Sequence, residues 1–139
     1  MSGTDAPGWF ETLDSRVVHG GFSTVRVDRV RMPDGQESDR EVVEHDDAVA
    51  VVPLFDDGTV VLLRQYRHPV GRYLLEVPAG KLDVEGEPAA DAARRELAEE
   101  VGLAAGRLDH LTTFHNSAGW CDERTHLYLG RDLSATEVE

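Results

Sequence analysis

The sequence predicts an α+β fold with many short strands and one strong helix. At 139 residues, the chain 1–139 is long enough to form one domain with its own hydrophobic core. Segments rich in β-branched residues recur between turn signals, before and after the helix. The helix is expected to begin near Pro88, which suits a first helical turn, and to end at Gly102, which suits a left-handed cap.

The expected strands are short and separated by turns. Residues 1–15 are expected to form a loose leader. The segments expected as strands are 24–32, 40–45, 48–55, 59–66, 74–78, 108–116 and 125–130. Two of them, 48–55 and 59–66, are expected to pair as a hairpin, because an Asp-Asp-Gly turn separates two apolar runs.

Composition narrows the class of partner. The formal charge of −13, from 27 acidic and 14 basic residues, disfavours a nucleic-acid polymer and suits divalent cations. No apolar run approaches the roughly 20 residues of a membrane span, and no secretory signal is visible, so no membrane partner is expected. Cys121 is the single cysteine, which excludes a disulfide within the chain and fits a reducing compartment. We therefore expect a cytoplasmic protein.

The helix carries an unusual cluster of charge. Its apolar stripe, expected to face the core, is Ala90, Ala93, Leu97 and Val101. Glu96, Glu99 and Glu100 lie beside that stripe within about 100° of one another. Each like-charge pair at such spacing costs a helix about 0.2–0.5 kcal/mol. A solvated glutamate-rich face is one explanation, and a site for Mg²⁺, which binds carboxylate oxygens, is the other.

The residues around the helix complete a longer pattern. From Gly80 to Leu103 the chain reads Gly, then Glu87, then R-E-L-A-E-E-V-G-L beginning at Arg95. This resembles the signature of the Nudix hydrolases, G-x5-E-x7-R-E-U-x-E-E-x-G-U, in which U is aliphatic. Gly80 lies seven residues before Glu87 rather than six, so the loop holds one extra residue. The resemblance implies the Nudix fold, a mixed β-sheet sandwich on which this helix packs.

The resemblance also implies a chemistry, the metal-dependent hydrolysis of a nucleoside diphosphate linked to another group. Mg²⁺ or Mn²⁺ would be the cofactor. The implied metal ligands are the carbonyl of Ala79 and the carboxylates of Glu96, Glu99 and Glu100. Arg95 would orient the glutamates through charge-assisted hydrogen bonds. In this family a catalytic-loop glutamate beyond this sequence normally takes part in catalysis, and Glu99 acting through a metal-bound water is the alternative general base.

Neighbouring segments resemble one branch of that family, the ADP-ribose pyrophosphatases. REVVEHDDAVAVV, LLRQYRHPVGRYLLEVPAGKLD and GWCDERTHLYL carry this resemblance. It implies cleavage of ADP-ribose to AMP and ribose 5-phosphate, with Arg67 at the phosphates or terminal ribose. Arg40 and Glu41 would contact the adenosine side, and Phe22 would stack on adenine. The plainer alternatives are a surface charge for Arg67, an exposed strand pair for Arg40 and Glu41, and a core position for Phe22.

The resemblance bears on assembly and on the C-terminus. Members of that branch are usually homodimers that exchange N-terminal strands, here residues 16–47. They also continue for several dozen residues, so the second helix and a catalytic-loop glutamate are expected to be missing from this sequence.

Two other functions stay open. One is hydrolysis of another nucleoside diphosphate derivative, such as a nucleotide sugar or NADH. The other is a non-catalytic module that binds ADP-ribose.

Overall fold

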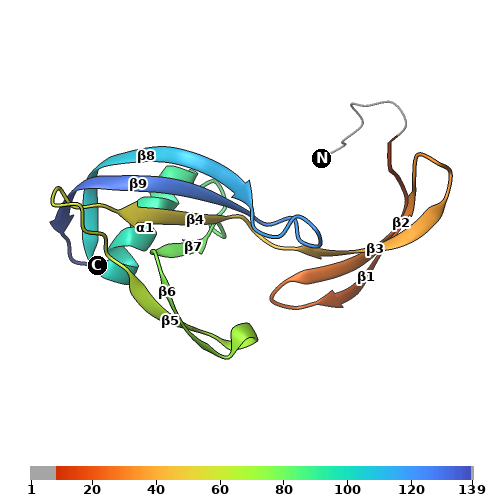
Figure 1. Cartoon of the computed structure of the whole chain (residues 1–139), viewed down its shortest axis with the longest axis horizontal. Coiled ribbons are helices and arrows are strands. Elements are labelled where there is room, and N and C mark those ends of the chain that lie inside the picture. Colours follow the sequence, from red (N-terminus) through yellow and green to blue (C-terminus); the bar gives the residue numbers. More distant parts are fainter. Residues whose placement is uncertain (1–8, 139) are drawn as a thin grey trace. The chain divides into compact units, whose positions relative to one another are not determined.

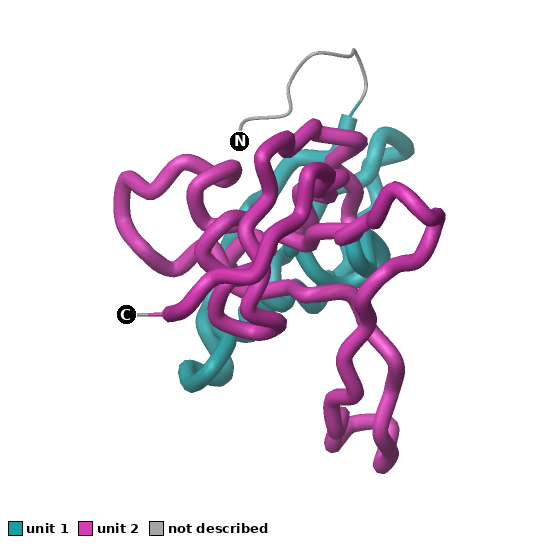
Figure 2. The backbone as a smooth tube through the Cα atoms, turned by 90° about the vertical axis from the view of Figure 1, so that its left-hand side faces the viewer, with its two compact units in different colours: residues 1–45, 116–123 teal, residues 46–115, 124–139 magenta. Residues whose placement is uncertain are grey.

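The computed structural model describes residues 9–138, which form two compact units. Unit 1 comprises the described residues up to 45 together with 116–123, and unit 2 comprises 46–115 and the described residues from 124 onward (Figure 2). Strands make up most of both units, and one α-helix lies within the described part of the chain. The expected α+β class is confirmed.

Unit 1 is built on a three-stranded antiparallel sheet. Its strands are β1 (Glu11–Gly20), β2 (Thr24–Arg31) and β3 (Glu37–Glu44), in that order across the sheet. The segments expected as strands at 24–32 and 40–45 are confirmed. The loose leader expected at 1–15 is wrong for residues 11–15, because they pair with β2 and form the first half of β1. Residues 1–8 lie outside the described part of the chain.

A loop from the second half of the sequence lies along β3. The amide of Val43 donates to the carbonyl of Trp120 at 2.8 Å, and the amide of Asp122 donates to the carbonyl of Val43 at 3.1 Å. Val43 and Cys121 thereby form a parallel bridge. The amide of His45 also donates to the Asp122 carboxylate at 2.9 Å. The loop is held at several successive points.

Unit 2 is built on a four-stranded mixed sheet (Figure 1). Its strands, in spatial order, are β7 (Ala79–Lys81), β4 (Ala48–Pro53), β9 (Arg124–Ala135) and β8 (Leu103–His115). β4 pairs with β9 in parallel and with β7 antiparallel. A separate two-stranded ribbon, β5 (Leu63–Arg67) and β6 (Arg72–Glu76), is joined by a short 3-10 turn, η1 (His68–Val70).

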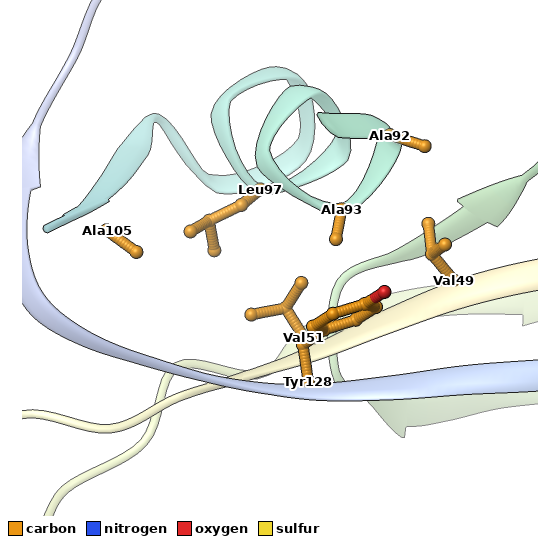
Figure 3. Close-up of a cluster of buried hydrophobic side chains, with 7 residues drawn as sticks. All are labelled: Val49, Val51, Ala92, Ala93, Leu97, Ala105 and Tyr128. Carbon is orange, nitrogen blue, oxygen red and sulfur yellow. The ribbon is translucent and has the colours of Figure 1, made fainter. Parts of the chain in front are cut away.

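The helix α1 (Ala89–Val101) packs on this sheet and closes the core. Figure 3 shows Leu97 and Ala93 pointing from the helix toward Val51 and Tyr128. The buried cluster consists of Val49, Val51, Ala92, Ala93, Leu97, Ala105 and Tyr128. Of the expected apolar stripe, Ala93 and Leu97 are fully buried, and Ala90 and Val101 are partly buried against the cluster. Among residues 9–138, no helix is long and apolar enough to cross a membrane.

The hairpin expected between 48–55 and 59–66 forms only close to its turn. The turn forms, since the Asp57 carboxylate accepts a hydrogen bond from the Thr59 amide at 2.9 Å. Beyond the turn, the two segments share one antiparallel bridge, Leu54 to Val60, and the amide of Val61 donates to the carbonyl of Pro53 at 3.2 Å. The reason is competition for β4, whose buried residues are already flanked by β7 and β9. The amide of Leu54, for example, donates to the carbonyl of Gly130 at 3.0 Å.

Candidate active site

The ends of α1 form as the sequence predicts. Pro88 precedes the helix in an extended conformation, and Gly102 ends it with φ of 66°, in the left-handed region that favours glycine. The amide of Gly102 donates to the carbonyl of Ala98 at 2.9 Å. Because Leu97 is buried against the sheet, the positions beside it along the helix are held in fixed orientation. Glu96 and Glu100 occupy two of those positions.

Both glutamates approach the backbone at Ala79 and Gly80. The amide of Ala79 donates to Glu100 Oε2 at 2.9 Å. A Cβ placed on Gly80 would overlap the carboxyl group of Glu96, so only glycine leaves room for that side chain. Two carboxylates from one helix therefore meet a distant strand, Glu96 at Gly80, 16 positions away, and Glu100 at Ala79, 21 positions away.

Arg95 links three carboxylates of the pattern. Its guanidinium donates to both carboxylate oxygens of Glu87 at 3.1 Å. It also donates to Glu96 at 2.9 Å and to Glu99 at 3.4 Å. The hydrogen bonds to Glu87, together with the charges of Glu96 and Glu87, raise the pKa of Arg95. The hydrogen bonds and the charge of Arg95 in turn lower the pKa of Glu87. The guanidinium thus holds Glu96 and Glu99 in place as a permanent cation.

The surroundings of Glu96 and Glu100 disfavour their charged forms. Loss of hydration is the largest cause that raises the pKa of Glu96, and the bonds from Arg95 oppose it. Loss of hydration also raises the pKa of Glu100, against the lowering effect of the Ala79 amide, and the charge of Glu96 raises it further. A cation placed between two such carboxylates would relieve both their repulsion and their desolvation.

The oxygen atoms of this cluster, from carboxylates and a backbone carbonyl, are of the type that a hard divalent cation binds. Carboxylates and backbone carbonyls are the ligands that Mg²⁺ and Mn²⁺ prefer. Among residues 9–138, however, no three His, Cys, Asp or Glu side chains converge closely enough to hold an ion. Glu96 and Glu99 instead turn toward Arg95, and Glu100 turns toward the Ala79 amide. Rotation of these side chains about their own bonds is needed before they share one cation.

Arg67 lies within electrostatic reach of this cluster. It makes two hydrogen bonds to Glu76, from Nε at 2.8 Å and from Nη2 at 2.5 Å. The charge of Arg67 lowers the pKa of Glu100, and the charge of Glu76 raises it. Glu76 is not among the residues that the sequence pattern predicts for this site. Its place three residues before Ala79 in LLEVPAG was the available signal.

The other three residues expected to bind substrate belong to unit 1. Arg40 and Glu41 are neighbours on β3 and both line a pocket of about 460 Å³. Phe22 does not line that pocket. Phe22 is 82% exposed, and its ring centroid lies 5.6 Å from that of His45. Two further lining residues, Arg16 and Trp120, are not among the residues that the sequence pattern predicts.

Comparisons with known proteins agree with this picture. Residues 44–139 match the NUDIX domain family, and residues 10–43 match the nucleoside diphosphate sugar hydrolase N-terminal domain. An ADP-ribose pyrophosphatase of Mycobacterium tuberculosis is 47% identical over 125 residues, which cover 89% of this chain and 60% of that protein. An ADP-ribose pyrophosphatase of Bacillus subtilis is 39% identical over 122 residues, covering 88% and 65%.

A solved structure is similar over nearly the whole chain. The crystal structure of an ADP compounds hydrolase superposes with a TM-score of 0.84 at 27% identity, covering 94% of this chain and 71% of that one. The chain spans less than two thirds of the length of the two curated relatives named above.

Proposed function

Because the chain belongs to the Nudix family, we propose that it hydrolyses the diphosphate bond of ADP-ribose, giving AMP and ribose 5-phosphate. The observation that carries this proposal is the approach of Glu96 and Glu100 to the Ala79–Gly80 backbone, with Arg95 fixing the neighbouring carboxylates. The names of the relatives from M. tuberculosis and B. subtilis support the choice of substrate.

The proposed metal ligands are the Ala79 carbonyl and the carboxylates of Glu96, Glu99 and Glu100. Bound Mg²⁺ or Mn²⁺ would supply Lewis-acid polarisation of a phosphorus and a more acidic water. Arg95 keeps Glu96 and Glu99 oriented, because its guanidinium donates to both. Glu99 is the more exposed of this pair, with 46% of its side chain accessible against 13% for Glu96, and is the proposed proton acceptor for the attacking water.

Arg67 is the proposed phosphate-binding residue. Its planar guanidinium presents two parallel donors, a geometry that suits phosphate oxygens. Glu76 accepts hydrogen bonds from Nε and Nη2 and holds the guanidinium in position, so a substrate phosphate would share Nη2 or displace Glu76 from these donors. A substrate phosphate would therefore meet an oriented cation rather than a mobile one, which reduces the entropy lost on binding.

A broader substrate range is the second candidate. The solved structure is named an ADP compounds hydrolase, and residues 10–43 match an N-terminal domain named for nucleoside diphosphate sugar hydrolases. Both names fit an enzyme that accepts several nucleoside diphosphate derivatives. Side-by-side turnover of ADP-ribose, an ADP-sugar and NADH separates this candidate from a dedicated ADP-ribose pyrophosphatase.

The test is cleavage of ADP-ribose by the chain with Mg²⁺, with Mn²⁺ and with EDTA. We expect metal-dependent release of AMP and ribose 5-phosphate. Glu96→Gln and Glu100→Gln should each lower turnover by orders of magnitude while leaving the fold intact. Glu85→Gln is the matched control, because Glu85 is an exposed carboxylate outside the cluster. Binding of ADP-ribose without turnover would indicate a binding module. Unchanged turnover in Glu96→Gln would contradict the proposed role of Glu96 as a metal ligand.

The proposal includes a cytoplasmic homodimer. The single cysteine supports the location. The edge strand β1 supports association, because all ten of its residues are exposed and its outer edge has no partner strand within residues 9–138. Light scattering after size-exclusion chromatography measures the mass directly, and a monomer at micromolar concentration would contradict the dimer.

A further inference from the structure

Three side chains of unit 2, outside the carboxylate cluster, converge at one point on the mixed sheet. They are His110 and Thr113 on β8 and His126 on β9, and together they form the imidazole cluster. The Nε2 atom of His110 lies 2.8 Å from Thr113 Oγ1, and the Nδ1 atom of His126 lies 3.1 Å from that same oxygen. Two imidazole nitrogens are therefore aimed at one position, which a threonine hydroxyl occupies.

A β-bulge in β8 places His110 and Thr113 on the same face of the sheet. Their partners on β9 are Tyr128 and His126, and the register shifts between His110 and Thr112. Directly opposed residues share a face, and residues two apart on a strand share a face as well. Residues three apart on a regular strand point to opposite faces. The extra residue of the bulge is therefore what brings His110 and Thr113 to one side.

Asp47 fixes the tautomer of His126. The other ring nitrogen of His126, Nε2, lies 3.1 Å from Asp47 Oδ2. Asp47 also accepts a hydrogen bond from Arg124 Nη2 at 2.7 Å, which favours its ionised form. An ionised carboxylate only accepts hydrogen bonds, so Nε2 of His126 carries the proton and the lone pair lies on Nδ1. That lone pair points at the centre of the imidazole cluster.

The ring of His110 is held by an aromatic contact and remains accessible. Its centroid lies 5.4 Å from that of Tyr128 in an edge-on arrangement, and Tyr128 is buried in the core. His110 and Thr113 are exposed, and the side chain of His126 is 21% exposed. In contact with solvent, His110 moves its proton from Nε2 to Nδ1 at little cost. Both imidazoles are thus oriented by the fold, and a dissolved ion reaches them.

These features match the ligand chemistry of a divalent transition-metal ion. Imidazole suits Zn²⁺, Cu²⁺ and Ni²⁺, whereas Mg²⁺ prefers oxygen ligands. A histidine that binds a metal almost always donates its other ring N–H to a carboxylate, a carbonyl or water. The hydrogen bond from His126 to Asp47 is a contact of this kind. It is present beside a second imidazole nitrogen, from His110, that is directed at the same point.

We propose that His110 Nε2 and His126 Nδ1 bind a divalent transition-metal ion, with Asp47 orienting His126. The Thr113 hydroxyl gives up its place to the ion by rotation about χ1, and water fills the remaining positions. Metal–nitrogen distances of about 2.0–2.1 Å are expected for Zn²⁺. The site shares no residue with the carboxylate cluster, so it binds a different class of ion and does not depend on the proposed hydrolysis.

The test is Cu²⁺ binding to the full chain, measured by calorimetry and by electron paramagnetic resonance. Millimolar Mg²⁺ is present throughout to occupy the carboxylates, which imidazole ligands do not compete for. We expect one Cu²⁺ per chain, with coupling to two imidazole nitrogens. His110→Ala and His126→Ala should each remove one of those couplings. Asp47→Asn should weaken Cu²⁺ binding about 10- to 100-fold, the usual effect of losing an orienting carboxylate, and the two ligand variants should weaken it further.

Two more variants separate metal binding from a purely structural hydrogen-bond network. Thr113→Ala removes the hydroxyl that joins the two rings and so breaks both of its hydrogen bonds. It should nevertheless leave Cu²⁺ affinity unchanged or raise it, because it clears the point where the nitrogens converge. His19→Ala is the matched control, since His19 is an exposed histidine of unit 1. It should bind Cu²⁺ as the unmutated chain does.

Equal Cu²⁺ affinity in His110→Ala, His126→Ala and His19→Ala would overturn the proposal. So would a spectrum without imidazole coupling, or a loss of affinity in Thr113→Ala as large as that in His126→Ala. Thermal melting confirms that each variant is folded. Glu96→Gln, which tests the proposed function, should leave the Cu²⁺ spectrum unchanged, so the failure of one proposal is distinguishable from the failure of the other.

Discussion

The Gly80→Ala variant is expected to change the free energy of unfolding only slightly and to lower ADP-ribose turnover strongly. The added methyl group would overlap the carboxyl carbon and both carboxyl oxygens of Glu96. Those atoms are the far end of a flexible side chain, so the glutamate rotates away and the backbone stays in place. Gly80 is not among the glycines with positive φ, so alanine adds no backbone strain there.

The expected cost in stability is small. Rotation of Glu96 gives up its hydrogen bond from Arg95, made at 2.9 Å between groups that are 13% and 31% exposed. Such a bond contributes about 1–2 kcal/mol after allowance for solvent at Arg95. Replacing glycine by alanine returns about 0.4–1 kcal/mol through the entropy of the unfolded chain. The net change should therefore stay within about 1–2 kcal/mol.

The expected cost in activity is large, because a misplacement of about 1 Å at a reacting centre can lower a rate about 100-fold. ADP-ribose hydrolysis at saturating Mg²⁺ and urea denaturation measure the two effects on the same sample. Gly20→Ala is the control, since a Cβ there meets nothing within 4 Å. A stable Gly80→Ala variant with full turnover would refute the reasoning that the position of Glu96 governs the reaction.

Three further predictions concern unit 2. Leu97→Ala should lower the free energy of unfolding by about 2–5 kcal/mol, because Leu97 is fully buried; a smaller loss in urea denaturation would contradict the core described above. Gly102→Ala should cost about 1–2 kcal/mol in the same assay, because φ is 66° at the helix end, and a neutral result would show that the cap tolerates a side chain. Burial alone would raise the pKa of Asp47, but hydrogen bonds from Arg124 and His126 outweigh it and lower that pKa. Asp47 therefore stabilises the fold above its unfolded pKa of about 4 and loses that effect as the pH falls through its lower folded value. Asp47→Asn should cost about 1–3 kcal/mol at pH 7, and the difference between the two chains should shrink toward pH 3; a constant difference would refute this.

The sequence by itself determined the local features. The ends of α1 follow from Pro88 and Gly102, because both act through the backbone of their own turn. The contact of Arg95 with Glu99 follows from helical spacing, which places residues one turn apart side by side. Such features depend on residues that are near one another in the chain, so a pattern of a few positions is enough to predict them.

Only the tertiary structure decided which distant segments meet. The apolar run of β4 looked like half of a hairpin, yet it pairs in parallel with β9, about 77 positions away, where Ala48 faces Thr125. The Ala79 amide reaches Glu100, and Trp120 joins Arg16 in one pocket, although no local pattern relates either pair. Burial of apolar surface is non-directional, so a hydrophobic strand specifies that it needs neighbours without specifying which ones. The choice among them depends on the packing of the whole chain.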